Sequence, residues 1–181
     1  MKKKLLWITE TAIMLALLVT LQTLTKPMGQ LVTGSCVNTV LAVSALVGGL
    51  GCGLTVALIS PVLAFLLNIA PQILTVPAIM VGNAVFVVLL SLLADKTGKK
   101  LVKQLIAWIT AAVAKFATLY AIVVWLICGL LSEKLLASGV MKAPMLQALP
   151  ATFSWPQLFT ALIGGAVALL IVPVLRKALH K

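Results

Sequence analysis

The sequence predicts an all-α fold, a polytopic membrane protein with six transmembrane helices and both termini cytoplasmic. Its 181 residues are 62% hydrophobic and only 9% charged, with a mean hydropathy of +1.22. Soluble domains are about 45–50% apolar and about 25% charged, so this chain has too few polar side chains to cover a surface in water. Its apolar residues also gather in stretches close to the roughly 20 residues that cross the hydrocarbon core. The length suits a single integral membrane domain over residues 1–181.

Six apolar stretches are candidate spans. They cover approximately residues 5–24, 36–50, 53–67, 74–94, 105–131 and 155–175. The first follows three lysines, but it is longer than a signal-peptide core of about 7–15 residues and no Ala-x-Ala site follows promptly, so we interpret it as a retained helix. The second and third are short and flank a glycine-rich turn, which predicts a helical hairpin or, alternatively, one re-entrant hairpin. The fourth is a clear span, the fifth is long enough to tilt or project from the bilayer, and the sixth is again clear.

Basic residues indicate which helix ends face the cytoplasm. Ten Lys and Arg lie before the first span, between the fourth and fifth, and after the sixth, whereas three lie in the opposite connections. Cytoplasmic loops carry the excess of Lys and Arg, and an even number of spans puts both termini on that side. The net charge of +11 would suggest nucleic acid in a soluble chain. Here membrane orientation explains it, and we expect no nucleic-acid partner.

The ionisable residues argue against an enzyme. The acidic residues are Glu10, Asp95 and Glu133, well separated along the chain, and the single histidine is His180. Paired carboxylates, His-activated nucleophiles and metal sites need more such residues in one place. The sequence also lacks Gly-x-Ser-x-Gly and a phosphate-binding Gly-rich motif ending in Gly-Lys-Ser/Thr. We therefore expect no catalytic residues, no cofactor, no metal and no ATPase activity of the chain's own.

Lys115 is the ionisable residue placed deepest in a predicted span. It lies ten residues beyond Leu105, which is about 15 Å along a helix and near the midplane. A lysine there costs at least about 2.5–3.5 kcal/mol unless water or a partner relieves it. We interpret it as a cation at the floor of a substrate site, which favours an anionic substrate. Alternatively, it snorkels toward the cytoplasm or reaches Glu10.

Amide and aromatic side chains supply further candidate contacts. Asn68 and Gln72 lie in a predicted outer loop, where a polar ligand could satisfy their amides. Asn83 lies near the middle of the fourth span, and for this residue alone interhelical hydrogen bonding is the slightly better explanation. Tyr120 could stack on a flat ligand or simply pack, and Trp155 lies near a span end, where anchoring at the membrane interface is the default.

Several features together resemble the substrate-binding S components of energy-coupling factor (ECF) vitamin transporters. Ala12 and Ala16 lie four apart on one helix face, a spacing that allows another helix to approach closely. The six helices, the glycine-rich hairpin and the outer loops Lys-Pro-Met-Gly-Gln (26–30) and Asn-Ile-Ala-Pro-Gln (68–72) are also similar to that family. The resemblance implies that Ala12 and Ala16 dock onto the transmembrane coupling subunit of an ECF module with two ATPase subunits. It also implies a multi-pass protein of the bacterial cytoplasmic membrane.

The resemblance implies a substrate site near the outer face, beneath outer loops. The candidate substrate contacts are then Lys115, Asn68, Gln72, Asn83, Tyr120 and Trp155. The expected function is high-affinity uptake of a vitamin or related small molecule, and Lys115 favours an anionic one such as pantothenate, biotin, lipoate or nicotinate. Two alternatives remain: a stand-alone secondary transporter or permease, although intramembrane carboxylates for a coupling ion are nearly absent, and a ligand-free membrane accessory subunit.

Overall fold

Six long helices form the body of the protein in the computed structural model, which describes residues 2–69, 72–95 and 100–179. The spans are α1 (Lys2–Thr25), α2 (Gln30–Val47), α3 (Gly49–Leu66), α4 (Val76–Leu93), α5 (Leu101–Leu119) with its π-helical continuation η3 (Tyr120–Leu130), and α8 (Trp155–Ala178). The shorter helices are η1 (Lys26–Met28), η2 (Ile73–Thr75), α6 (Ser132–Ala137) and α7 (Ala143–Phe153). All six spans are long and apolar enough to cross a membrane, which confirms the predicted all-α class and the number of spans.

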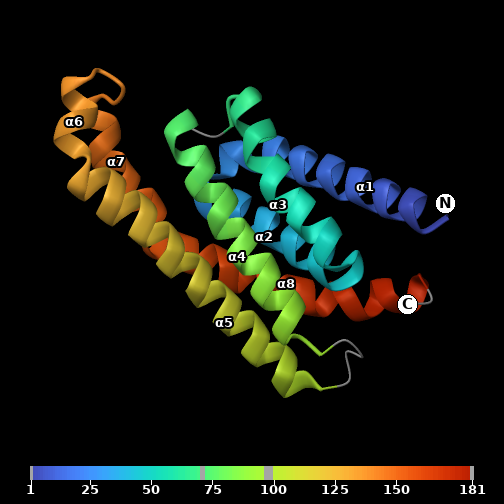
Figure 1. Ribbon diagram of the computed structural model, residues 1–181. Helices are drawn as coiled ribbons and strands as arrows, with labels where there is room; N and C mark the ends of the chain where they lie inside the picture. The colour runs from blue at the N-terminus through green and yellow to red at the C-terminus, as the bar shows by residue number, and fades with distance from the viewer. Residues whose placement is uncertain (1, 70–71, 96–99, 180–181) are drawn as a thin grey trace.

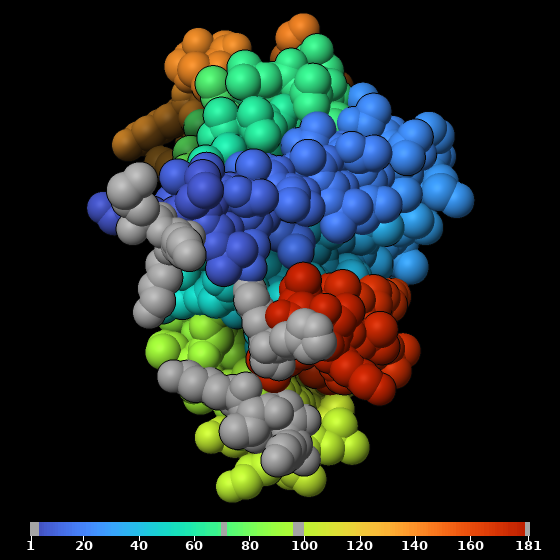
Figure 2. Space-filling model, turned by 90° about the vertical axis from the view of Figure 1, so that its right-hand side faces the viewer, coloured from blue at the N-terminus to red at the C-terminus, as the bar shows by residue number. Residues whose placement is uncertain are grey.

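The two chain ends lie at the same end of the bundle, and α6 and α7 lie at the opposite end (Figure 1). Figure 2 looks onto the end that carries the termini and shows α1 at the surface, with α8 and the start of α5 below it. An even number of spans requires this arrangement. The cytoplasmic location of the termini stays a prediction. Residues 70–71 of the predicted outer loop, residues 96–99 of the predicted basic segment and His180 lie outside the described residues.

The second and third spans form two separate helices, and each is long and apolar enough to cross a membrane. Each is 18 residues long, and they meet at Gly48 and Gly49. At about 1.5 Å per residue each helix is close to the thickness of the hydrocarbon core. Gly49 has a φ of +86°, a conformation that a residue with a Cβ rarely adopts, so glycine allows the chain to reverse here.

Helix α2 begins at Gln30, six residues before the predicted start at residue 36. Its first turns carry polar side chains, so hydropathy alone shortens the helix. Thr33 donates its hydroxyl to the Thr25 carbonyl at 2.8 Å, and Ser35 bonds back to the Leu31 carbonyl at 2.7 Å. Similarly, the predicted fifth and sixth spans leave residues 132–154 as a connection between them, and the structure shows that this connection contains α6 and α7.

Helix α2 lies at the centre of the bundle. Residues 40–46 are buried without interruption, which requires neighbours on every side of the helix. These neighbours are α1, α3, α4 and α8. The approach of α8 is especially close, because the Thr39 hydroxyl donates to the Gly164 carbonyl at 3.1 Å and a Cβ at Gly164 would clash with the α2 backbone.

A cluster of buried apolar side chains holds α7 against the C-terminal part of the fifth span. Leu119, Val123 and Ile127 follow one another at intervals of four residues on the α5–η3 helix, and they pack against Leu149 and Phe153 of α7. Residues four apart lie on one face of a helix, so these three side chains form one stripe toward α7. The cluster places the end of α7 beside the interior of the bundle.

Candidate substrate-binding cavity

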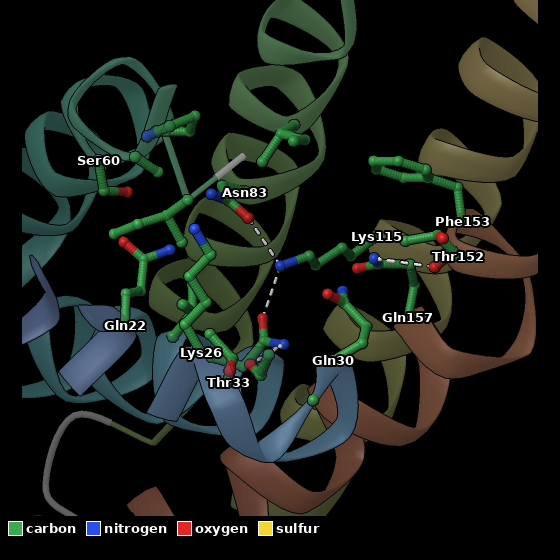
Figure 3. Close-up of a pocket in the computed structure, with 18 residues that line it drawn as sticks. Gln22, Lys26, Gln30, Thr33, Ser60, Asn83, Lys115, Thr152, Phe153 and Gln157 are labelled. Atoms are coloured by element: carbon green, nitrogen blue, oxygen red, sulfur yellow. Dashed lines mark hydrogen bonds between the residues drawn. The ribbon is translucent and has the colours of Figure 1, made fainter. Parts of the chain in front are cut away.

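A cavity of about 260 Å³ lies inside the end of the bundle that carries α7 (Figure 3). Each of the six spans contributes to its wall, together with η1 and α7. The lining residues are Gln22, Lys26, Gly29, Gln30, Thr33, Gly34, Val37, Asn38, Ser60, Pro61, Ala64, Ile69, Ile79, Asn83, Lys115, Thr152, Phe153 and Gln157. Because the wall is assembled from residues far apart in the chain, the cavity depends on the packing of the whole bundle.

The Lys115 ammonium is held between two amide side chains. Its Nζ donates to Asn38 Oδ1 at 2.6 Å and to Asn83 Oδ1 at 2.7 Å. Lys115 is 3% exposed and the two asparagines are each 1% exposed. The bonds join α2, α4 and α5. The side chain therefore ends inside the bundle, and its two acceptors are neutral amides rather than the carboxylate of Glu10 that the sequence left open.

Further contacts fix the position of this ammonium group. Asn38 donates its Nδ2 to the Gly34 carbonyl at 2.9 Å and to the Thr160 hydroxyl at 3.3 Å, so its Oδ1 is turned toward Lys115. On another side, the Phe86 ring centroid lies 5.6 Å from the ammonium nitrogen. An aromatic ring at this distance attracts a cation through its quadrupole. These contacts orient the cation without neutralising it.

The cavity carries positive charge that its own described wall does not balance. Lys26 and Lys115 line it, and neither Asp nor Glu is among the described lining residues. Amide oxygens stabilise an ammonium group by hydrogen bonding, but they supply no opposite charge. A buried charge without a counter-ion is costly in a low-dielectric interior. The arrangement therefore favours the entry of an anionic group.

Lys26 connects two segments at the edge of the cavity. It lies on η1 after the first span, and its Nζ donates to the main-chain carbonyl of Asn68 after α3 at 2.6 Å. Asn68 has a φ of +55°, in the left-handed region that asparagine tolerates better than most residues. The lysine thus links the η1 segment to the end of the third span beside the cavity.

The predicted contact residues occupy different places in the structure. Lys115 and Asn83 line the cavity and bond to each other. Asn68 takes part through its carbonyl, as the acceptor of Lys26. The Gln72 carbonyl accepts a hydrogen bond from the Thr75 hydroxyl at 2.9 Å at the start of η2.

The two aromatic candidates lie away from this ammonium group. Tyr120 and Trp155 are 45% and 63% exposed, and both rings pack on Phe116, with centroids 5.9 and 5.6 Å apart. Tyr120 follows Lys115 by five residues, which places it on another face of the helix. A role of either ring in substrate binding stays a prediction.

Sequence reasoning did not include Asn38, Gln22, Ser60 and Lys26 among the site residues. The first three are polar side chains within long apolar helices, and this placement was the available signal. It does not reveal which helices meet. Only the packing of α1, α2 and α3 brings the three residues to one cavity.

A bundle of six membrane-spanning helices around a small, positively charged cavity is the architecture of a membrane protein that binds a small substrate. The family model for the substrate-specific component of ECF transporters matches residues 6–176. The match covers most of the chain, so the protein belongs to this family and is a multi-pass membrane subunit that binds a substrate for uptake. Comparisons with curated proteins and with solved structures gave no match.

Proposed function

We propose that this protein binds an anionic vitamin or a related small organic acid with high affinity for uptake, and that the acid group lies beside the Lys115 ammonium. The observation that carries the proposal is the buried Lys115, whose two side-chain hydrogen-bond acceptors are the neutral amides of Asn38 and Asn83. An ammonium group has three N–H donors, so one remains for an acid oxygen. The resulting bond would join opposite charges and relieve the uncompensated cation.

The size of the cavity agrees with a small substrate. Its volume of about 260 Å³ lies just below the usual range of about 300–1,000 Å³ for ligand pockets. A second ammonium group, that of Lys26, adds to the attraction for an anion. The volume favours a compact molecule of vitamin size, and the two ammonium groups favour an acid over a neutral or cationic molecule.

The direct test compares acids with their uncharged counterparts by isothermal titration of the purified protein. The pairs are nicotinate and nicotinamide, pantothenate and pantothenol, biotin and biotinamide, and lipoate and lipoamide. We expect an acid to bind, and its uncharged counterpart to bind about tenfold to a hundredfold more weakly, because hydrogen bonds to charged groups contribute about 1.5–3 kcal/mol. Equal affinity for both members of each binding pair would contradict the proposal.

Lys115→Met tests the role of the lysine itself. It keeps an unbranched side chain one atom shorter but removes the charge, and we expect the same loss of about tenfold to a hundredfold in affinity for the acid. Lys115→Arg tests whether charge alone is sufficient. Lys103→Met is the matched control, because Lys103 is an exposed lysine on the same helix that lies outside the cavity. If Lys115→Met keeps the wild-type affinity for the acid, the lysine has a structural role, and the proposal of an anionic substrate is wrong.

We also propose that α1 docks onto the transmembrane coupling subunit of an ATP-driven ECF module in the bacterial cytoplasmic membrane. Two observations support this. Ala12 and Ala16 are both exposed on α1, and this helix turns Thr11 and Leu18 inward instead. Small exposed side chains one turn apart permit close helix approach in a membrane.

Coexpression with the coupling subunit and the two ATPase subunits tests this docking surface. The double variant Ala12→Leu with Ala16→Leu is expected to bind substrate normally but to be absent from the purified complex. Ile13→Phe is the control, because Ile13 is 57% exposed and large already. Normal assembly of the double variant would exclude this face. Substrate entry into liposomes without nucleotide or partner subunits would support a stand-alone permease instead.

A further inference from the structure

The cavity wall contains two buried oxygen atoms with no hydrogen-bond partner among the described residues. They are Gln22 Oε1 on α1 and Ser60 Oγ on α3. Figure 3 shows both side chains on one side of the cavity and Lys115 on the other. Buried polar atoms in folded proteins nearly always have a partner, so an exception needs an explanation. Because both residues line the same cavity, a single ligand bound there could supply the missing hydrogen-bond partners of both oxygens.

Other polar groups of the same wall are satisfied by the protein. The Gln157 amide nitrogen donates to the Thr152 carbonyl at 3.2 Å, and the Thr33 hydroxyl donates to the Thr25 carbonyl at 2.8 Å. The contrast is sharpest for serine. Ser44 of α2 bonds back to the carbonyl four residues earlier at 2.7 Å, as helical serines often do, whereas Ser60 makes no such bond.

The chemistry of these two oxygens specifies what can bind to them. An amide oxygen only accepts hydrogen bonds, so the partner of Gln22 Oε1 must be an N–H or O–H group. A serine hydroxyl can accept from the same group or donate to its oxygen. A carboxylate has no donor of its own when ionised. The group that satisfies this side of the cavity is therefore different from the acid group that suits Lys115.

We propose that the substrate is an organic acid that also carries a hydroxyl or N–H donor separate from its acid group. The acid group lies at Lys115, and the donor lies at Gln22 and Ser60. This inference rests on the proposed function, which it extends from charge to a two-ended pattern of recognition. Among small acids it selects those with hydroxyl, amide or ureido groups, such as pantothenate and biotin. It excludes acids without a further donor, such as nicotinate and lipoate.

Isothermal titration with these four acids tests the pattern. We expect pantothenate or biotin to bind the wild-type protein. The affinity for nicotinate and for lipoate is expected to be lower by about tenfold or more. In the double variant Gln22→Met with Ser60→Ala, the affinity for the donor-bearing acid is expected to fall by about tenfold or more, because two hydrogen bonds are lost. Gln147→Met is the control, because Gln147 is exposed on α7 and lies outside the cavity.

Thermal unfolding without added acid provides an independent readout. Gln22→Met with Ser60→Ala removes two oxygen atoms that have no hydrogen-bond partner among the described residues, so the ligand-free variant is expected to be at least as stable as the wild type. This expectation also ensures that a loss of binding is not a loss of folding. A clear drop in melting temperature would mean that the two oxygens serve the fold, and it would overturn the inference.

The remaining outcomes separate this inference from the proposed function. Tight binding of nicotinate or lipoate that depends on Lys115 would overturn the donor requirement and leave the proposed function intact. The same holds if a donor-bearing acid keeps its affinity in the double variant but loses it in Lys115→Met. Binding of none of the four acids to the folded protein would also count against the donor-bearing class.

Discussion

Gly164→Ala is expected to destabilise the protein by forcing α8 away from α2. A Cβ at this position would lie 2.5 Å from the Ser35 carbonyl oxygen, 2.6 Å from Asn38 Cβ and 2.8 Å from the Thr39 nitrogen. Ordinary contacts begin near 3.4 Å, so the two helices must separate by several tenths of an ångström. Two of the three close atoms belong to the backbone, which cannot change rotamer to make room.

The magnitude follows from two opposing effects. Overpacking a tight interior costs about 1–3 kcal/mol, and the backbone contacts here place Gly164→Ala in the upper part of that range. Replacing glycine by alanine within a helix returns about 0.8–1.0 kcal/mol. The expected net loss is therefore about 1–2 kcal/mol. Because Asn38 is one of the residues that must move, the variant is also expected to weaken the 2.6 Å bond to Lys115 and with it the binding of an acid.

Thermal unfolding in detergent, followed by the fluorescence of the four tryptophans, measures the stability change. For a chain of this size the expected loss corresponds to a melting temperature lower by about 2–8 °C. Gly129→Ala is the matched control, because the nearest atom to its Cβ would be the Val124 carbonyl oxygen at 3.7 Å, an ordinary contact. Gly129→Ala should not lower the melting temperature. If Gly164→Ala is as stable as this control, the close packing of α2 and α8 does not determine stability.

Two further substitutions change polar groups of the cavity wall: one alters its charge, and the other removes a hydrogen bond at its edge. Asn83→Asp places a carboxylate where an amide oxygen now accepts from Lys115 at 2.7 Å, so the protein would supply its own counter-ion. We expect its unfolding temperature to be unchanged or higher and its affinity for an acid to fall about tenfold or more in isothermal titration; undiminished acid binding would show that the charge of Lys115 is not used. Lys26→Met removes the 2.6 Å hydrogen bond from Lys26 Nζ to the Asn68 carbonyl. Because this hydrogen bond is exposed to solvent, we expect the free energy of unfolding to fall by at most about 1.5 kcal/mol. Faster amide hydrogen exchange in residues 26–30 is the measurement for Lys26→Met, and unchanged exchange there would mean that this bond does not restrain the η1 segment.

Hydropathy predicted the number of spans because each helix must present an apolar surface to lipid. It misplaced the ends where polar side chains serve the interior. Helix α2 begins six residues early because Gln30 and Thr33 line the cavity instead of facing lipid. Residues 132–154 look like a polar connection, yet Leu149 and Phe153 fold onto the fifth span and make α7 part of the wall.

The site could be predicted only as far as single residues reveal it. Lys115 and Asn83 stand out because a polar group in an apolar helix needs a partner. The identity of that partner depends on which helices are neighbours and how they are rotated. Asn38 meets Lys115 only because α2 occupies the centre of the bundle. The relation between Gln22 and Ser60 likewise exists only after α1 and α3 have packed around the same cavity.

The bonding of Lys115 also bears on how the chain is made. Its acceptors, Asn38 and Asn83, belong to helices that are synthesised earlier, since α2 and α4 precede α5 in the chain. During translation the two acceptors are thus made before the lysine, the same N-terminal-first order in which whole domains generally fold. If the helices associate in this order, Lys115 finds its acceptors already in the membrane and avoids the cost of an unpartnered ammonium group in lipid. A circular permutation that placed α5 first would reverse this order, and the newly made helix would then have to wait for its partners.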